Sequence, residues 1–223
     1  VRRQFFSVSD TGKVLVNTTK KALLIDEQGT ITALINEPLV VNEWEFVNQL
    51  RSSAYFDSNF YLQHGGNILK YSETGILQET INSGWDNVAS NMQGDGIEID
   101  VSQNIILVAE SRSRQGGTGQ GYFYTLEKNT NTNQWSKTNS IQLPYHAVGV
   151  KRDPNSGAVY VIGENQNVGA YLTKFVQAGG GNWTQDWHVD YTQSGIFNKV
   201  DITSSGQILV SGTGRFAQPS SHL

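Results

Sequence analysis

A short phrase that recurs at regular intervals constrains the fold of this chain more than any other feature. The segments SVSDTGKVLVNTTK (residues 7–20) and DITSSGQILVSGTG (residues 201–214) both place a polar turn before an apolar run that ends in Leu-Val. Comparable runs follow five turn residues, spaced by 47, 45, 53 and 49 residues: Gly12, Asn59, Asn104, Gly157 and Gly206. Internal similarity at this spacing indicates a chain built from repeated supersecondary units.

Each repeat is predicted to contain short strands joined by tight turns. Gly and Asn most readily adopt a left-handed backbone, so each turn residue is expected at the tip of a hairpin. Apolar patterning then predicts strands at 4–8, 13–18, 22–26 and 31–35; 60–63, 68–71 and 76–81; 97–101, 105–110, 122–126 and 135–141; 147–150, 158–162, 170–175 and 183–189. No stretch shows the capped 3.6-residue period of a helix.

Four antiparallel strands repeated about every 45–50 residues are typical of an all-β fold, the β-propeller, in which each four-stranded blade packs against its neighbours. We expect one propeller domain over residues 1–223, with units at about 1–38, 39–82, 83–142 and 143–192 and a partial fifth at 193–223. The fifth unit contains only two strands. Either the terminal segments pair unconventionally or the chain is a fragment of a larger propeller, which we favour.

The tryptophans follow the same repeat. Trp44, Trp85, Trp135 and Trp183 lie 41, 50 and 48 residues apart, one in each of the first four units. Large aromatic side chains at equivalent positions of a repeat are expected to pack between adjacent blades. Trp187 is the additional tryptophan and is therefore a candidate for another role.

Composition excludes several classes of function. The chain has 223 residues, no cysteine and a net charge of −4. Disulfides, thiolate metal sites and thiol catalysis are therefore excluded, and no basic stripe suits nucleic acid. No apolar run approaches the 18 residues of a membrane span. Lack of cysteine is compatible with the cytosol and with the cell exterior, of which an extracellular or cell-surface location is slightly favoured.

Two segments resemble known propeller repeats. SGWDNVASNMQGDGIEIDVSQNIILVAES (residues 83–111) resembles the repeat of tectonin-type propellers, which implies a propeller that recognises glycans or surface ligands. GKVLVNTTKKALLIDEQGTI (residues 12–31) resembles a bacterial propeller repeat with a Gly-Lys-φ-Leu-Val strand and a later Asp-x-x-Gly-Thr turn, which implies the fold alone. Neither resemblance transfers individual site residues.

Aromatic and polar side chains near strand ends are the best binding candidates, because sugars stack on aromatic rings and hydrogen-bond to amides and carboxylates. GNWTQDWHVD (residues 181–190) supplies Asp186, Trp187 and His188. Further candidates lie in LQHGG and LPYHA: His64, Tyr145 and His146. For each of these residues, packing or a surface position is the ordinary alternative.

Metal, phosphate and catalytic patterns are weak. Asp95, Glu98 and Asp100 lie close together in QGDGIEID and form the one candidate for a hard-cation site, although EF-hand spacing is absent and solvated carboxylates are the ordinary alternative. RQGGTGQG (residues 114–121) lacks the Lys-Ser/Thr of a phosphate loop and is predicted to be a hairpin loop. There is no Gly-x-Ser-x-Gly elbow, and no cofactor is expected.

The sequence leaves three functions open. The first is a non-catalytic recognition module that binds a glycan or a surface ligand through propeller rim loops. The second is a protein–protein interaction scaffold within a larger protein or assembly, in which additional blades or another chain complete the ring. The third is a propeller enzyme of the glycosidase or lyase type, whose paired carboxylates would converge on the central channel.

Overall fold

The computed structural model describes residues 5–17, 21–36, 50–64, 66–83, 96–102, 104–112, 120–165, 169–179, 181–191 and 195–214. Every regular element in these ranges is a β-strand. None of them contains a helix of the length and hydropathy needed to cross a bilayer. The predicted all-β class is therefore confirmed.

The strands form four four-stranded antiparallel sheets and one two-stranded sheet, each paired in chain order. The first two sheets contain β1 (Phe5–Val8), β2 (Val14–Asn17), β3 (Lys21–Ile25) and β4 (Ile31–Asn36), then β5 (Leu50–Phe56), β6 (Asn59–His64), β7 (Asn67–Ser72) and β8 (Leu77–Asn82). The third and fourth contain β9 (Gly96–Ser102), β10 (Ile105–Arg112), β11 (Gln120–Asn129) and β12 (Gln134–Leu143), then β13 (His146–Arg152), β14 (Val159–Asn165), β15 (Gly169–Gln177) and β16 (Trp183–Tyr191). The fifth contains β17 (Gly195–Ile202) and β18 (Ile208–Gly214). Four complete units and a partial fifth are confirmed.

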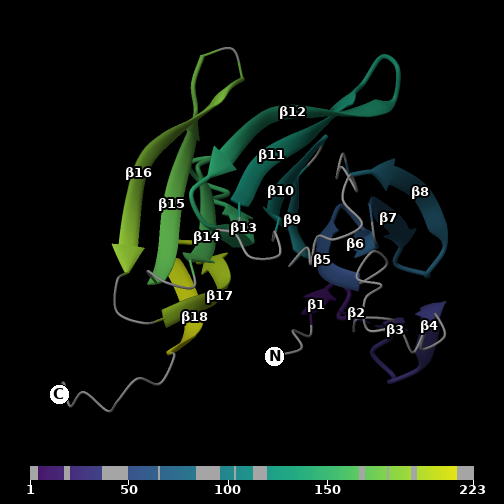
Figure 1. Cartoon of the computed structure of the whole chain (residues 1–223). Coiled ribbons are helices and arrows are strands. Elements are labelled where there is room, and N and C mark those ends of the chain that lie inside the picture. Colours follow the sequence, from purple (N-terminus) through teal and green to yellow (C-terminus); the bar gives the residue numbers. More distant parts are fainter. Residues whose placement is uncertain are drawn as a thin grey trace.

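The sheets follow one another around a common centre (Figure 1). The first strand of each sheet contacts the first strand of the next, in the order β1, β5, β9, β13 and β17. The fourth strands β4, β8, β12 and β16 lie at the periphery (Figure 1). This radial stacking is the β-propeller arrangement that the repeat predicts.

Four of the five turn residues lie between the first and second strands of their sheets, and Asn59 does not. Gly12, Gly157 and Gly206 adopt positive φ angles of 81°, 73° and 80°, as expected for hairpin tips. In the second sheet the prediction for Asn59 is wrong, because Asn59 is already the first residue of β6 and pairs with Phe56. The intervening residues, 57 and 58, have φ angles of 50° and 56° and form a two-residue hairpin loop.

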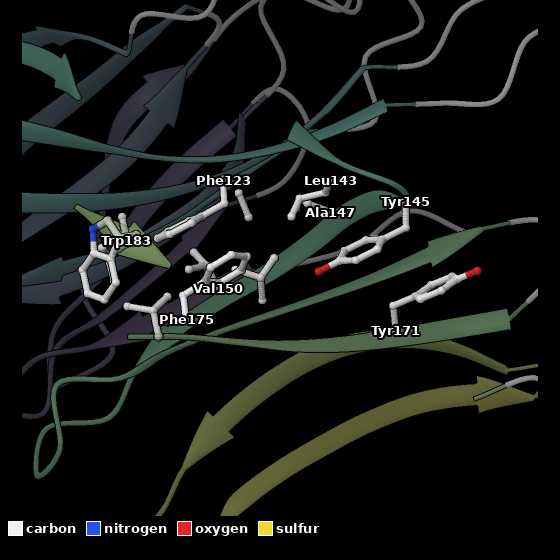
Figure 2. Close-up of a cluster of buried hydrophobic side chains, with 12 residues drawn as sticks. Phe123, Leu143, Tyr145, Ala147, Val150, Tyr171, Phe175 and Trp183 are labelled. Atoms are coloured by element: carbon white, nitrogen blue, oxygen red, sulfur yellow. The ribbon is translucent and has the colours of Figure 1, made fainter. Parts of the chain in front are cut away.

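The core is divided into layers between consecutive sheets. The largest layer lies between the third and fourth sheets and is shown in Figure 2, with Trp183 at one end and the rings of Tyr145 and Tyr171 at the other. Trp183 is 6% exposed, and Trp135 packs at the equivalent layer between the second and third sheets. The predicted inter-blade packing is confirmed for these two tryptophans. Trp44 and Trp85 lie outside the described residues.

Candidate functional site

A cavity of about 600 Å³ lies among the first strands of all five sheets. We call it the central cavity, and it is lined by residues 6–8, 53–55, 99–100, 148–151 and 198–201. Within the described part of the chain, each first strand pairs with a second strand on one side only, so its other edge carries backbone N–H and C=O groups that need partners outside the sheet. The wall is therefore rich in hydrogen-bonding groups from five separate strands.

Side chains link neighbouring first strands around this cavity. The Ser7 hydroxyl donates to the Ser53 hydroxyl at 2.8 Å, which joins β1 to β5. The Ile99 amide donates to the Ser52 hydroxyl at 3.0 Å, which joins β5 to β9. Ser52 thus satisfies a backbone amide of β9, and the Ser7–Ser53 bond links the side chains of β1 and β5.

Asp100 performs the same function between β9 and β13. One carboxylate oxygen accepts from the Arg152 backbone amide at 2.8 Å, and the other is 3.2 Å from the Lys151 ammonium. Both oxygens of Asp100 are thus engaged within the protein. The described residues include no group of three His, Asp or Glu side chains that could hold a metal ion.

The other two members of the proposed cation site fall wholly or partly outside the described residues. Asp95 lies outside the described residues. Glu98 pairs through its backbone with Ala109, and its side chain is also outside the described part of the structure. The hard-cation site at Asp95, Glu98 and Asp100 therefore stays a prediction.

A lysine and an aromatic ring from different sheets meet at the central cavity. The ammonium of Lys199, on β17, is 5.3 Å from the centre of the Phe6 ring on β1. Phe6 is 60% exposed, and Lys199 is exposed as well. Such a pair is held by the attraction between a cation and the negative face of the ring. It joins the first and fifth sheets at the cavity.

Three of the predicted binding residues, Tyr145, His146 and His188, come together near the layer between the third and fourth sheets rather than at the cavity. The Tyr145 ring is 1% exposed and stacks on Tyr171 at 4.9 Å and 7° (Figure 2). Its hydroxyl shares a 2.6 Å hydrogen bond with Thr173, whose hydroxyl also lies 2.7 Å from Nδ1 of His188. Burial raises the pKa of both tyrosines above the ordinary value. This network fastens the segment between β12 and β13 to the fourth sheet.

His146 lies beside this network. Its Nδ1 atom is 2.7 Å from the Ser111 hydroxyl, and both side chains are buried. In a hydrolytic triad a histidine activates a serine as nucleophile, but the serine must also be accessible to the substrate. Burial of both residues between the sheets gives the pair a packing role in this structure.

The remaining predicted residues are spread over other surfaces. Trp187 is partly buried and lies 5.9 Å from the Tyr160 ring, on the side of the fourth sheet that faces β17. Asp186 forms an ion pair with Lys174 at 2.8 Å, at a β-bulge in β16. His64 ends β6 in the second sheet. A ligand role for these residues remains a prediction.

Apart from Asp100, which was proposed as a cation ligand, sequence reasoning missed the residues that line the central cavity, including Phe6 and Lys199. One pattern could have indicated them. In β1, buried Ser7 alternates with the exposed apolar residues Phe6 and Val8, which reverses the usual burial of a half-buried strand.

Comparison with known proteins supports the fold and does not indicate a specific activity. No family model matches the sequence, and no curated protein matches it. Among solved structures, a protein of unknown function from Bacteroides caccae shares 12% identity with a TM-score of 0.61, and the match covers 92% of this chain and 69% of that one. A gluconolactonase from Xanthomonas campestris shares 10% identity with a TM-score of 0.60, covering 92% and 68% of the two chains.

A third similar structure is PorZ, a surface component of the type-IX secretion system of Porphyromonas gingivalis. It shares 11% identity with a TM-score of 0.60, and the match covers 93% of this chain and 31% of PorZ. Identities this low carry information about fold and not about activity. The shared feature is the propeller architecture.

Proposed function

We propose that this chain is a non-catalytic recognition module whose central cavity binds a carbohydrate or a similar polar surface ligand. The observation that carries this proposal is the cavity itself, about 600 Å³ in volume and bordered by the first strands of all five sheets. This volume lies within the range of pockets that enclose small ligands. It can accommodate one or a few sugar rings.

The lining supports a ligand rich in hydroxyl groups. Ser7, Ser53 and Asn198 supply hydroxyl and amide groups, and Phe6 and Tyr55 supply aromatic surface. Sugars combine hydroxyls with apolar C–H faces, so this mixture matches their chemistry. The resemblance of residues 83–111 to tectonin-type repeats points in the same direction.

Binding is favoured over glycoside hydrolysis. Hydrolysis requires two carboxyl groups that flank the scissile bond and are open to the substrate. The central cavity contains Asp100 and Asp201, but Lys151 and the Arg152 amide already engage the two oxygens of Asp100. Among the described lining residues, Asp201 therefore has no second carboxylate that is open to a substrate, which supports recognition without catalysis.

A glycan array followed by titration calorimetry tests this function. We expect at least one oligosaccharide to bind with a Kd below about 1 mM, equivalent to more than about 4 kcal/mol of binding free energy. An array with no reproducible binder, together with flat calorimetric titrations, would rule out the carbohydrate proposal.

A second candidate is a scaffold that joins further propeller strands. Within the described residues β18 pairs only with β17, whereas the second strand of every other sheet pairs on both sides. Both end sheets carry exposed apolar side chains, Phe6 and Val8 on β1 at the cavity and Leu209 on β18. We propose as occupants two further antiparallel strands that complete the fifth sheet and additional blades or another chain that closes the ring. The recognition and scaffold functions both require the exposed Phe6 ring, because a sheet packed on β1 would cover the ring and keep a ligand from it.

Hydrogen exchange measures whether the β18 edge is free. In the isolated chain, the β18 amides that point away from β17 should exchange at least about a hundredfold faster than amides of β14, which lies between two strands. Equal protection of β18 and β14 would contradict a free edge and with it the scaffold proposal.

A further inference from the structure

We propose that the ligand of the central cavity carries a carboxylate, as a hexuronic acid residue does, and that Lys199 and Phe6 recognise it. This inference rests on the proposed function and specifies the class of sugar. It starts from the charged groups in the cavity wall, which are Asp100, Lys151, Lys199 and Asp201.

These four charges are not equally engaged. Asp100 and Lys151 form an ion pair with each other at 3.2 Å. One oxygen of Asp201 accepts the backbone amide of Ile202 at 2.9 Å. Among the described residues, the Lys199 ammonium lies over the Phe6 ring rather than beside a carboxylate. Lys199 is therefore the cation of the cavity that can bind a ligand anion without breaking an internal ion pair.

Phe6 specifies the rest of the ligand. With 60% of its surface exposed, the ring offers an apolar face that can cover the C–H side of a pyranose. A hexuronate combines such a face with a carboxylate on the same ring. The lysine side chain is long and flexible, so its ammonium can leave the phenyl ring for a carboxylate that offers a stronger attraction.

The neighbouring charges favour a monoanion over a phosphate. Lys199 and Asp201 are two residues apart on β17, and both are exposed. Alternation along a strand places them on the same face. A phosphate group carries about −1.5 to −2 charges, and Asp201 would repel it more strongly than a single carboxylate. One lysine thus matches one carboxylate, while Asn198 and the remaining hydrogen-bonding capacity of the paired Ser7 and Ser53 hydroxyls serve the sugar hydroxyls.

Titration of trigalacturonic acid and its methyl ester tests the inference, because the two ligands differ only in charge and in the ester methyl groups. The wild-type chain should bind the acid roughly tenfold more tightly than the ester, as expected for one charge-assisted contact. Lys199→Met should remove this preference and leave binding of the ester within about twofold of wild type. Lys70→Met is the matched control, because Lys70 also lies over an aromatic ring, 5.8 Å from the centre of Tyr61, but does not line the cavity.

The outcomes separate the two levels of the proposal. Equal binding of acid and ester, or a preference for the ester, would overturn the role of Lys199 and leave carbohydrate recognition standing. A preference for the acid that survives Lys199→Met, or that Lys70→Met removes as well, would also overturn it. Absence of binding by either ligand and by every sugar on the glycan array would overturn both the inference and the proposed function.

Discussion

Replacement of Gly163 by alanine should destabilise this protein by about 3 kcal/mol. Gly163 lies in β14, opposite Ala147 and Tyr171 of the flanking strands. A Cβ atom at this position would lie 2.0 Å from Cδ2 of Tyr145 and 2.3 Å from the carbonyl oxygen of His146. The second contact is with backbone, so a rotation of a side chain cannot relieve it. The segment of Tyr145 and His146 that leads into β13 would have to move away from β14.

Chemical denaturation followed by circular dichroism measures the loss of stability. In a thermal melt, the melting temperature should fall by roughly 6–12 °C. Gly179→Ala is the matched control, because a Cβ atom at Gly179 meets nothing within 4 Å. The control should change stability by less than about 0.5 kcal/mol. A Gly163→Ala variant as stable as the control would show that Tyr145 and His146 do not pack against β14 in the manner described.

Trp183→Ala should cost about 3–5 kcal/mol, the usual loss when a buried tryptophan is removed from a core. Trp183 is 6% exposed and packs against the Phe123 ring at 5.8 Å and 71°, in the edge-to-face arrangement that aromatic pairs prefer. The contact joins β16 of the fourth sheet to β11 of the third. Its loss therefore weakens the packing between blades as well as within one of them.

Trp187→Ala is the control for this prediction, since Trp187 lies on the same strand but is only partly buried. Its removal should cost less than half as much. Urea unfolding monitored by fluorescence of the remaining tryptophans compares the two variants. Equal losses, or a larger loss for Trp187→Ala, would contradict the assignment of Trp183 as the inter-blade residue.

The repeat was predictable from sequence because its turns and core positions are local. A glycine at positive φ and the apolar run after it lie within a few residues of one another, as at Gly157 and β14. The first strand of the second unit, β5, was not predicted. Its sequence, LRSSAYF, places Ser52 and Ser53 where apolar residues would be expected. These serines bond to β9 and β1 instead, and only the folded ring brings those partners near.

The candidate site was harder to predict than the fold. The aromatic and histidine residues chosen from sequence include Tyr145 and His188, whose rings lie 5.8 Å apart in the layer between two sheets. Residues of the central cavity come from five first strands, about 45–50 positions apart in the chain, so no local motif marks them. Phe6 and Lys199 lie at opposite ends of the sequence and meet only when the sheets are arranged around a centre.

The central claim is that ligand binds in the cavity among the first strands, and filling that cavity tests it most directly. Val8 lines the cavity and is 49% exposed, whereas Leu77 is also 49% exposed but lies on β8, away from the lining. Val8→Trp should weaken binding of the best oligosaccharide at least tenfold by calorimetry, and Leu77→Trp should leave it unchanged, with equal melting temperatures in both. Full affinity in a folded Val8→Trp variant would contradict the claim and place the ligand elsewhere on the molecule.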